Sequence, residues 1–406
     1  MTHDVKPLDG IRVVEFSHMV MGPSTGLVLA DLGAEVIKIE PPGGDKTRRL
    51  PGSGQGFFPM YSRNKRSVIA DLKTEEGLDF TRRIVSTADV VTENFRAGAM
   101  TALGLDYPTL SRDNPRLVYC SLKGFLSGPY EDRAALDEVV QMMGGLAYMT
   151  GKPGEPLRAG ASVNDVMGGM FAVIAILAAL RERDRTSRGS VIRSGLFENN
   201  LFLVGQHMAQ FALSGQPAAP MPARLSAWAV YDVFTTKDGE QVFVAAVSDG
   251  QWKALCLAFG LDELAQDPDL RTNALRVGQR DKFLPILRIA IADYLAAELL
   301  GVCQAAGLPY APVRAPHELY DDPHVSQSPG AMIDVQMPDG ATLAVPALPV
   351  DFDGDRPGKG GPVEQPGAST RQVAEQLGYP EATVERLVEV AVPHKEASVT
   401  QGRNSQ

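Results

Sequence analysis

The sequence predicts an α/β protein with a doubly wound parallel sheet, and a βαβ unit at the start of the chain is the main reason. Ile11–Phe16 is apolar and indicates a buried strand, and Gly22–Leu32 has the pattern of a helix. Glu35–Glu40 is a second strand, which Pro41–Gly44 ends. A strand, a helix and a strand in this order place the two strands parallel in one sheet.

The same alternation continues through the first half of the chain. We expect further strands at Val90–Thr92, Leu117–Leu122 and Ser190–Arg193. We expect helices at Glu75–Ser86, Leu136–Tyr148, the apolar part of Ala159–Leu180, and about Leu196–Leu213. Arg181–Gly189 is highly charged and is expected to be a solvated break.

The character of the sequence changes after Gly215–Arg224, a stretch with three prolines that is a candidate linker. At 406 residues the chain is long enough for two domains, and a smaller second domain is expected here. The predicted elements of this domain are a hairpin around Lys237–Gly239 and helices at Asp249–Gly260, Gln279–Tyr294 and Ala296–Ala306. After this domain we expect a hairpin around Pro338–Gly340 and helices at Thr370–Leu377 and Glu381–Val390.

Composition narrows the class of protein. The net charge of −10 disfavours nucleic acid as a partner. The three cysteines are far apart and the six histidines lack metal-binding spacing, so we expect neither a disulfide framework nor a bound metal. No signal peptide is recognisable, and the longest apolar run, Met170–Leu180, is shorter than the roughly 20 residues of a membrane span. We therefore expect a soluble, cytoplasmic protein that does not bind membranes.

Seven basic residues lie close together near the N-terminus of this acidic chain. They are Lys46, Arg48, Arg49, Arg63, Lys65, Arg66 and Lys73. Such a cluster indicates either a bound anion of several charges, with phosphates the obvious choice, or a solvated basic face. A nicotinamide enzyme is disfavoured because Ser17–Gly22, after the first strand, lacks the GxGxxG spacing that a pyrophosphate needs.

Asp165 is the candidate nucleophile. It lies at the predicted start of an apolar helix, after the cap-forming residues Ser162 and Asn164. We expect unpaired helix amides to keep its carboxylate ionised while apolar surroundings remove water, although capping alone also explains an Asp at this position. Gly168 and Gly169 leave room for the close approach of another backbone or of a ligand.

A set of segments follows one order along the first half of the chain: Leu8–Glu15, Gly22–Pro23, Leu29–Asp45, Asn64–Ser67, Asp71–Lys73, Ala88–Arg96, Asn114–Tyr119, Gly124, Gly128–Pro129 and Asp165. Together these segments resemble CoA-transferase family III, the group of formyl-CoA transferase and carnitine CoA-transferase that also contains the α-methylacyl-CoA racemases. The resemblance implies a large α/β domain built from both chain ends, with a smaller α+β domain inserted, and an interlinked, ring-like homodimer. We accordingly assign residues 1–215 and 326–392 to the large domain, 225–325 to the small domain and 393–406 to a disordered tail.

The resemblance also implies roles for single residues. Asp165 matches the family's nucleophile. Val20 and Met21 match residues beside the pantetheine end of CoA. The other positions that match CoA contacts are Asp71, Leu72, Lys73, Asn94, Phe95, Arg96, Arg133 and Leu136. Coenzyme A is then a cosubstrate, and no tightly bound cofactor or metal is implied.

Departures from the family pattern narrow the expected reaction. Pro41 and Val20 replace an arginine and a glutamine of formyl-CoA transferase, which makes oxalate a doubtful acceptor. Leu136 stands where the racemases place a catalytic histidine. The expected reaction is CoA transfer from a short acyl-CoA, succinyl-CoA being one candidate, to a small carboxylate or dicarboxylate. An acyl-CoA racemase and a non-catalytic CoA-binding protein are the alternatives.

Overall fold

The computed structural model describes residues 5–224, 226–358 and 360–391, and it divides into two compact units. The large unit contains residues up to Ala218 and residues from Ser328 onward. The small unit is Ala219–Gln327. The predicted tail, 393–406, lies outside the described residues.

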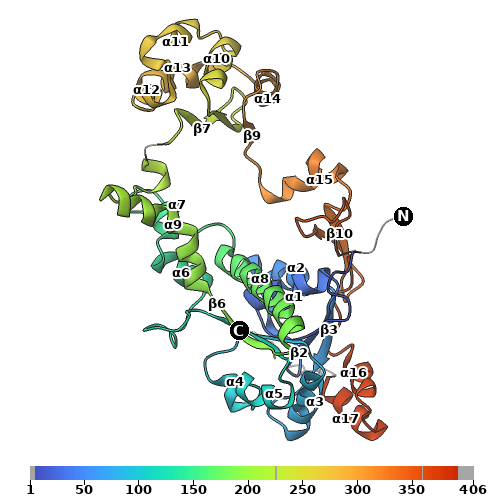
Figure 1. The fold of residues 1–406 in the computed structure, drawn as a ribbon. Coiled ribbons are helices and arrows are strands. Elements are labelled where there is room, and N and C mark those ends of the chain that lie inside the picture. Colours follow the sequence, from blue (N-terminus) through green and yellow to red (C-terminus); the bar gives the residue numbers. More distant parts are fainter. Residues whose placement is uncertain (1–4, 225, 359, 392–406) are drawn as a thin grey trace, which may run out of the picture. The chain divides into compact units, whose positions relative to one another are not determined.

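A six-stranded parallel sheet with the order β3-β2-β1-β4-β5-β6 forms the centre of the large unit (Figure 1). Its strands are β1 (Arg12–Phe16), β2 (Glu35–Glu40), β3 (Lys65–Ile69), β4 (Val90–Glu93), β5 (Val118–Lys123) and β6 (Ser190–Gly195). The predicted parallel α/β sheet is thus confirmed. The order reverses between β1 and β4, where open parallel sheets leave a crevice at their carboxyl edge.

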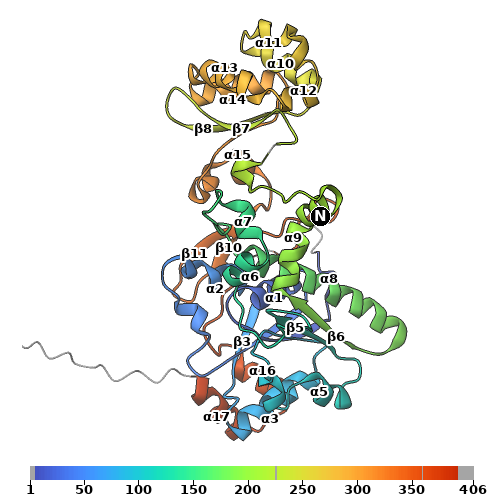
Figure 2. The same ribbon diagram turned by 90° about the vertical axis from the view of Figure 1, so that its left-hand side faces the viewer.

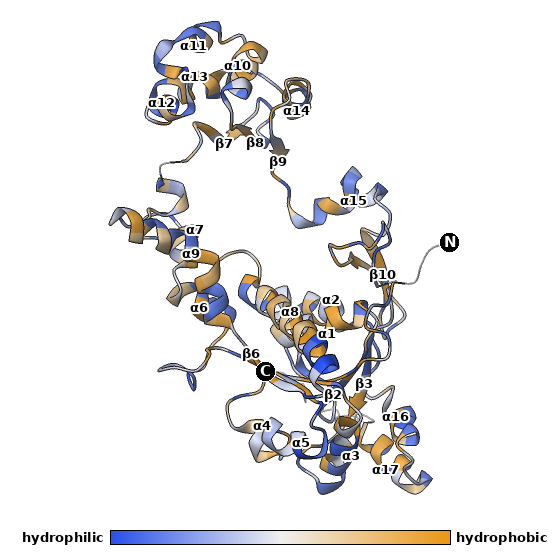
Figure 3. Cartoon of the chain, in the orientation of Figure 1, coloured by the Kyte–Doolittle hydropathy of each residue, from blue (hydrophilic) through white to orange (hydrophobic). Residues whose placement is uncertain are grey.

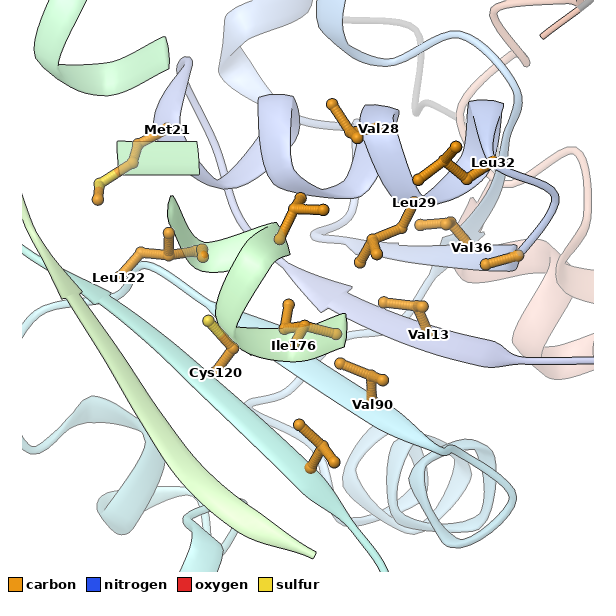
Figure 4. Close-up of a cluster of buried hydrophobic side chains, with 14 of the residues drawn as sticks. Val13, Met21, Val28, Leu29, Leu32, Val36, Val90, Cys120, Leu122 and Ile176 are labelled. Carbon is orange, nitrogen blue, oxygen red and sulfur yellow. The ribbon is translucent and has the colours of Figure 1, made fainter. Parts of the chain in front are cut away.

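Alternating side chains of β1 supply the two layers of the core. Val13 packs with residues of α1 (Met21–Asp31) and α8 (Val163–Thr186), as Figure 4 shows. Val14 and Phe16 point to the opposite face and pack with α3 (Glu75–Ser86). Helices therefore cover both faces of the sheet, with α1 and α8 on one side and α3 on the other (Figure 1).

Two predicted helices have different limits in the structure. The expected helix Leu136–Tyr148 is two short helices, α6 (Asp137–Met143) and α7 (Leu146–Thr150), because Gly145 between them has φ +86°. The predicted break at Arg181–Gly189 was wrong, since α8 continues to Thr186 and ends at Ser187, which has φ 58°. The next helix, α9 (Leu196–Ser214), follows β6 directly.

By length and composition α8 could cross a membrane, although 39% of its most apolar window is buried inside the protein. Figure 3 shows hydrophobic residues along much of this helix. It is the main partner of α1 and also packs against β5 and β6. A core helix of a soluble protein can meet the same criteria, so the length and composition of one helix are weak evidence for a membrane span.

The C-terminal segment completes the large unit. Helices α16 (Thr370–Gln376) and α17 (Glu381–Ala391) pack on the α3 side of the sheet (Figure 2). The edge strand β3 is paired by this segment, since the backbone N–H of Ile69 donates to Thr370 Oγ1 at 3.0 Å and that of Ser369 donates to the Ser67 carbonyl at 3.0 Å. The predicted hairpin is β10 (Met332–Gln336) with β11 (Thr342–Pro346). Shorter elements of this unit are the 3-10 turns Lys46–Arg49 and Gly52–Gly56, α2 (Phe57–Tyr61), α4 (Ala99–Ala102) and α5 (Tyr107–Asp113).

The small unit is an antiparallel sheet covered by helices. Its strands are β7 (Val230–Thr235), β8 (Gln241–Ala246) and β9 (Tyr310–Pro312). Its helices are α10 (Asp249–Ala258), α11 (Asp262–Gln266), α12 (Asn273–Val277), α13 (Arg280–Ala292), α14 (Ala296–Ala305) and α15 (Pro323–Gln327). The hairpin and the three longer helices were predicted; β9, α11 and α12 were not, because each is only three to five residues long.

Candidate active site

A cleft of about 750 Å³ opens at the carboxyl edge of the sheet, where the strand order reverses. The residues that follow four neighbouring strands line it: Ser17–Met19 after β1, Pro41 and Pro42 after β2, Ala70–Lys73 after β3 and Phe95 after β4. Lys46 and Lys73 add cationic groups to a mostly apolar wall. A cleft of this kind suits a ligand that joins an aromatic ring to phosphates.

The structure places four of the predicted CoA contacts in this cleft, namely Asp71, Leu72, Lys73 and Phe95. Asn94 acts beside it by holding the loop after β1: its Oδ1 accepts the backbone N–H of His18 at 3.1 Å, and its Nδ2 donates to the His18 carbonyl at 2.8 Å. The ring of His18 lies 6.2 Å from that of Phe95, and burial lowers the pKa of His18. His18 is therefore neutral at neutral pH.

Three other predicted contacts are not among the residues that line this cleft in the described chain. Arg96 lines a separate cavity of about 370 Å³ together with Lys123 and Arg193. The guanidinium of Arg133 lies over the ring of Tyr130, 5.3 Å from its centroid. Leu136 is 60% exposed and directly precedes α6.

The basic cluster divides into two groups. Four of its seven members form ion pairs inside the protein: Arg48 with Glu40 at 2.5 Å, Arg63 with Asp31 at 2.8 Å, Lys65 with Glu15 at 2.7 Å, and Arg66 with Glu35. Arg49 donates to the Gly43 carbonyl at 2.7 Å, which leaves Lys46 and Lys73 in the cleft. The cluster is therefore neither a single anion site nor a solvated face.

The loop that lines the cleft leads into α1, which packs against α8, the helix that carries Asp165. Val20 and Met21 are buried at the start of α1, immediately after the cleft residue Met19. A Cβ atom on Gly168 of α8 would come 2.4 Å from Met21 Cε. The glycines of α8 thus allow the close approach of α1. Of the two expected reasons for these glycines, another backbone or a ligand, this contact supports the first.

Asp165 lies in the first turn of α8, as predicted, and is partly buried. The predicted capping was wrong, because Ser162 makes no side-chain hydrogen bond to the helix. Asp137 of α6 caps it instead: its Oδ1 accepts the backbone N–H of Asn164 at 2.7 Å and that of Asp165 at 3.2 Å. Sequence reasoning missed this role, since nothing in the sequence brings α6 to the end of α8.

The expectation that helix amides keep Asp165 ionised was also wrong. Burial is the main cause that raises the pKa of Asp165 to about 7, and the charges of Asp137 and Glu138 raise it further. The helix amides give no compensation, because Asp137 occupies two of them, Val163 N–H donates to the Ala161 carbonyl and Val166 N–H to that of Ser162.

The family model for CoA-transferase family III matches residues 8–363. The chain belongs to CoA-transferase family III. The enzyme is 36% identical over 357 residues to succinate–glutarate CoA-transferase of Agrobacterium fabrum, covering 85% of this chain and 89% of the relative. It is 37% identical over 314 residues to acetyl-CoA:oxalate CoA-transferase of Acetobacter aceti, covering 76% and 80%. A CaiB/BaiF family protein from Brucella suis has the same fold, with a TM-score of 0.81 and 34% identity over 92% of this chain and 99% of that one.

Two further residues of this CoA-transferase complete the surroundings of Asp165. Tyr61, at the end of α2, has a pKa that is raised by burial and then by the charge of Asp165, so its hydroxyl stays protonated in the surroundings of Asp165. Sequence reasoning missed Tyr61, which lies in a segment without a periodic pattern. Gln141 of α6 is buried, and its Oε1 accepts the backbone N–H of Ala159 at 2.8 Å, which is a structural role.

The backbone amides of Gly144 and Gly168, two glycines near Asp165, are not free to stabilise an oxyanion. The N–H of Gly144 donates to the Val140 carbonyl at 2.8 Å, and Gly168 is inside α8. Among the described residues, no group of three or more His, Cys, Asp and Glu side chains is arranged to hold a metal ion.

Proposed function

We propose that this CoA-transferase moves CoA from succinyl-CoA to a small dicarboxylate through covalent intermediates on Asp165. The observation that carries the proposal is that Asp137 takes the amides at the start of α8 and leaves the Asp165 carboxylate without them, close to where α1, the helix after the cleft loop, meets α8. The named relatives support the donor and acceptor classes, since one acts on succinate and glutarate and the other on acetyl-CoA and oxalate.

The residues that line the cleft indicate how CoA binds. The adenine lies against Phe95, Leu72 and the prolines after β2, and Lys46 and Lys73 bind phosphate groups. The pantetheine arm extends from Met19 past the start of α1 toward α8, because Met21 of α1 lies beside Gly168 of α8, three residues after Asp165.

The reaction proceeds by two exchanges at carbonyl carbons. A carboxylate oxygen of Asp165 attacks the thioester carbonyl; a C–O bond forms, the C–S bond breaks, and CoA leaves as a thiolate with the electron pair, giving an acyl-aspartyl anhydride. The thiolate then attacks the aspartyl carbonyl; a C–S bond forms, the bond from this carbonyl carbon to the bridging oxygen breaks, and the donor acid leaves as its carboxylate. The acceptor carboxylate repeats both steps in reverse, and Asp165 is regenerated.

Labelling of Asp165 tests the proposal. The protein is incubated with succinyl-CoA, trapped with hydroxylamine and mapped by mass spectrometry. We expect a hydroxamate at Asp165, which Asp165→Ala abolishes and which Asp184→Ala retains, because Asp184 is exposed in the last turn of the same helix. Transfer by Asp165→Ala at the rate of the unchanged protein, or labelling at another residue, would refute the mechanism.

We also propose a homodimer, for which the exposed apolar side chains of α8 and α9 are the support. Ile174 is 60% exposed, Phe202 72% and Leu213 90%. Such a surface is unusual on a soluble monomer. Sedimentation of the purified protein is expected to give twice the chain mass, and a monomer at micromolar concentration would contradict this. An interlinked arrangement of the two subunits and a cytoplasmic location stay predictions.

A further inference from the structure

Asp137 is a buried carboxylate that the proposed reaction does not use. It is 4% exposed and lies in the first turn of α6. Both of its oxygens are occupied: Oδ1 accepts the N–H groups of Asn164 and Asp165, and Oδ2 accepts Gln141 Nε2 at 2.5 Å. No cation of the described residues forms an ion pair with it. A buried, negatively charged cap is therefore fixed beside the nucleophile.

The residues that donate hydrogen bonds to Asp137 are themselves held by other buried hydrogen bonds. Gln141 is fully buried, and while its Nε2 donates to Asp137, its Oε1 accepts the backbone N–H of Ala159. Asn164 is also fully buried and donates through Nδ2 to Asn200 Oδ1 at 3.2 Å. Asp137 thus cannot turn away from the end of α8 without leaving several buried polar groups unpaired, which costs about 1–3 kcal/mol for each group.

We propose that Asp137 is a positioning residue that takes the N-terminal amides of α8 away from Asp165, so that the nucleophile's carboxylate is held in place without being stabilised. The inference rests on the proposed function of Asp165. A carboxylate that accepts helix amides is a weak nucleophile, because those hydrogen bonds must be given up when its charge is lost. Since Asp137 accepts them, Asp165 has no such bonds to lose.

Acylation of Asp165 also removes a like charge from beside Asp137. In the aspartyl-CoA thioester the carboxylate oxygen has been replaced by sulfur, and the negative charge has left with the released acid. The repulsion between the two carboxylates therefore raises the free energy of the resting enzyme and not that of the intermediate. Asp137 accordingly favours formation of the covalent intermediate.

Replacing Asp137 by Asn removes the charge and keeps one oxygen to accept the N–H groups of Asn164 and Asp165; only the hydrogen bond from Gln141 Nε2 is lost, because an NH2 group takes the place of Oδ2. The titratable groups of the described chain that interact electrostatically with Asp165 are Asp137 and Glu138 from α6 and Tyr61 from α2. With Asp137→Asn we expect the acidic limb of the pH profile for acylation to move to lower pH. We also expect the equilibrium fraction of aspartyl-CoA to fall about tenfold, which corresponds to about one pKa unit.

Glu138→Gln is the matched control. Glu138 is adjacent in α6, and its charge also raises the pKa of Asp165. It pairs with Arg158 and is about half exposed, and among the described residues it accepts no amide of α8. Its removal is expected to shift the acidic limb less than Asp137→Asn does. Asp137→Glu keeps the charge and is expected to keep the limb near its original position. A merely structural role for Asp137 would change thermal stability in these variants without moving the limb.

The decisive measurement is a direct titration of Asp165 by ¹³C NMR in the free protein, with Asp165→Asn to assign the resonance. A lower pKa of Asp165 in Asp137→Asn supports the inference, and an unchanged pKa with an unchanged acidic limb overturns it. An equal shift in Glu138→Gln also overturns it, because proximity of charge alone would then suffice. If Asp165 is never labelled by acyl-CoA while this titration still moves, the proposed function fails and not the charge relationship.

Discussion

Gly169 of α8 packs directly against Ser24 of α1: a Cβ atom on Gly169 would come 2.2 Å from Ser24 Oγ and 3.0 Å from the Met21 carbonyl oxygen. Ser24 cannot easily move, because its hydroxyl donates to that same carbonyl at 2.9 Å. The helix of the nucleophile and α1, the helix that follows the cleft loop, thus pack at a contact that leaves no room for a side chain on Gly169.

Gly169→Ala is expected to destabilise the large unit by about 1–3 kcal/mol, because the added methyl group must push α1 away from α8. Gly301→Ala in α14 is the control, since its Cβ would meet no atom within 4 Å, and Ala is expected to stabilise that helix by about 0.5–1 kcal/mol. Chemical denaturation of both variants measures the difference. Equal stability of Gly169→Ala and the unchanged protein would show that the contact can relax.

Asp165→Asn is expected to stabilise the protein at alkaline pH. The folded-state pKa of about 7 lies above the ordinary value of 3.8, so between these values the folded chain holds a proton that the unfolded chain has lost. Stability of the unchanged protein therefore falls as the pH rises through this window, and the loss is complete above about pH 7. Because Asp165 is partly exposed, we expect a gain of about 1–2 kcal/mol for the variant at pH 8.

The measurement for Asp165→Asn is the difference in free energy of unfolding between variant and unchanged protein at pH 5 and at pH 8. Contributions from all other groups cancel in that difference. A difference that stays constant with pH would mean that Asp165 titrates normally in the folded chain.

Lys73→Ala is expected to weaken CoA binding about tenfold, because Lys73 is an exposed cation at the rim of the cleft with phosphate as its proposed partner. Lys46→Ala should have a similar effect, and both variants should reduce the dependence of binding on salt. Lys237→Ala, at an exposed position of the small unit, is the control and should bind CoA normally. Calorimetry at two salt concentrations distinguishes a cleft effect from a general loss of positive charge.

Arg63→Ala is expected to destabilise the protein by about 3–5 kcal/mol, because it leaves Asp31 buried without its ion-pair partner. Neither side chain of this pair is exposed to solvent. Arg49→Ala removes an equal charge from an exposed position of the same segment and should change stability by no more than about 0.5 kcal/mol. Thermal unfolding of the two variants gives the comparison, and similar losses would mean that net charge and not burial decides.

The pattern of apolar residues along the chain was enough to predict the central sheet and α8. The βαβ unit at Ile11–Glu40 and the apolar spacing after Asp165 predicted the parallel sheet and α8, because burial on both faces leaves its mark on consecutive residues. The break at Gly145 was missed because its conformation, with φ +86°, is not visible in a helical pattern. The last turns of α8 were missed because exposed Arg and Glu residues fit a surface helix as well as a loop.

The site was harder to predict, since it depends on contacts between segments far apart in the chain. The helix position of Asp165 was readable, but its ionisation depends on Asp137, 28 residues away, which takes its amides. The basic cluster misled for the same reason. Whether Arg63 or Lys73 is available to a ligand depends on whether a distant acid pairs with it, and spacing along the chain does not record that.

The pairing of β3 by the C-terminal segment sets the order in which the protein becomes complete during synthesis. The N–H of Ser67 donates to Glu364 Oε2 at 2.7 Å, and Val373 and Leu387 fill the core beneath the same sheet. A nascent chain that has only reached the small unit therefore carries an open sheet edge and an uncovered apolar face. The edge of β3 stays unpaired until the chain has been synthesised as far as α16. Slow synthesis, or truncation before α16, is therefore expected to favour aggregation of this enzyme.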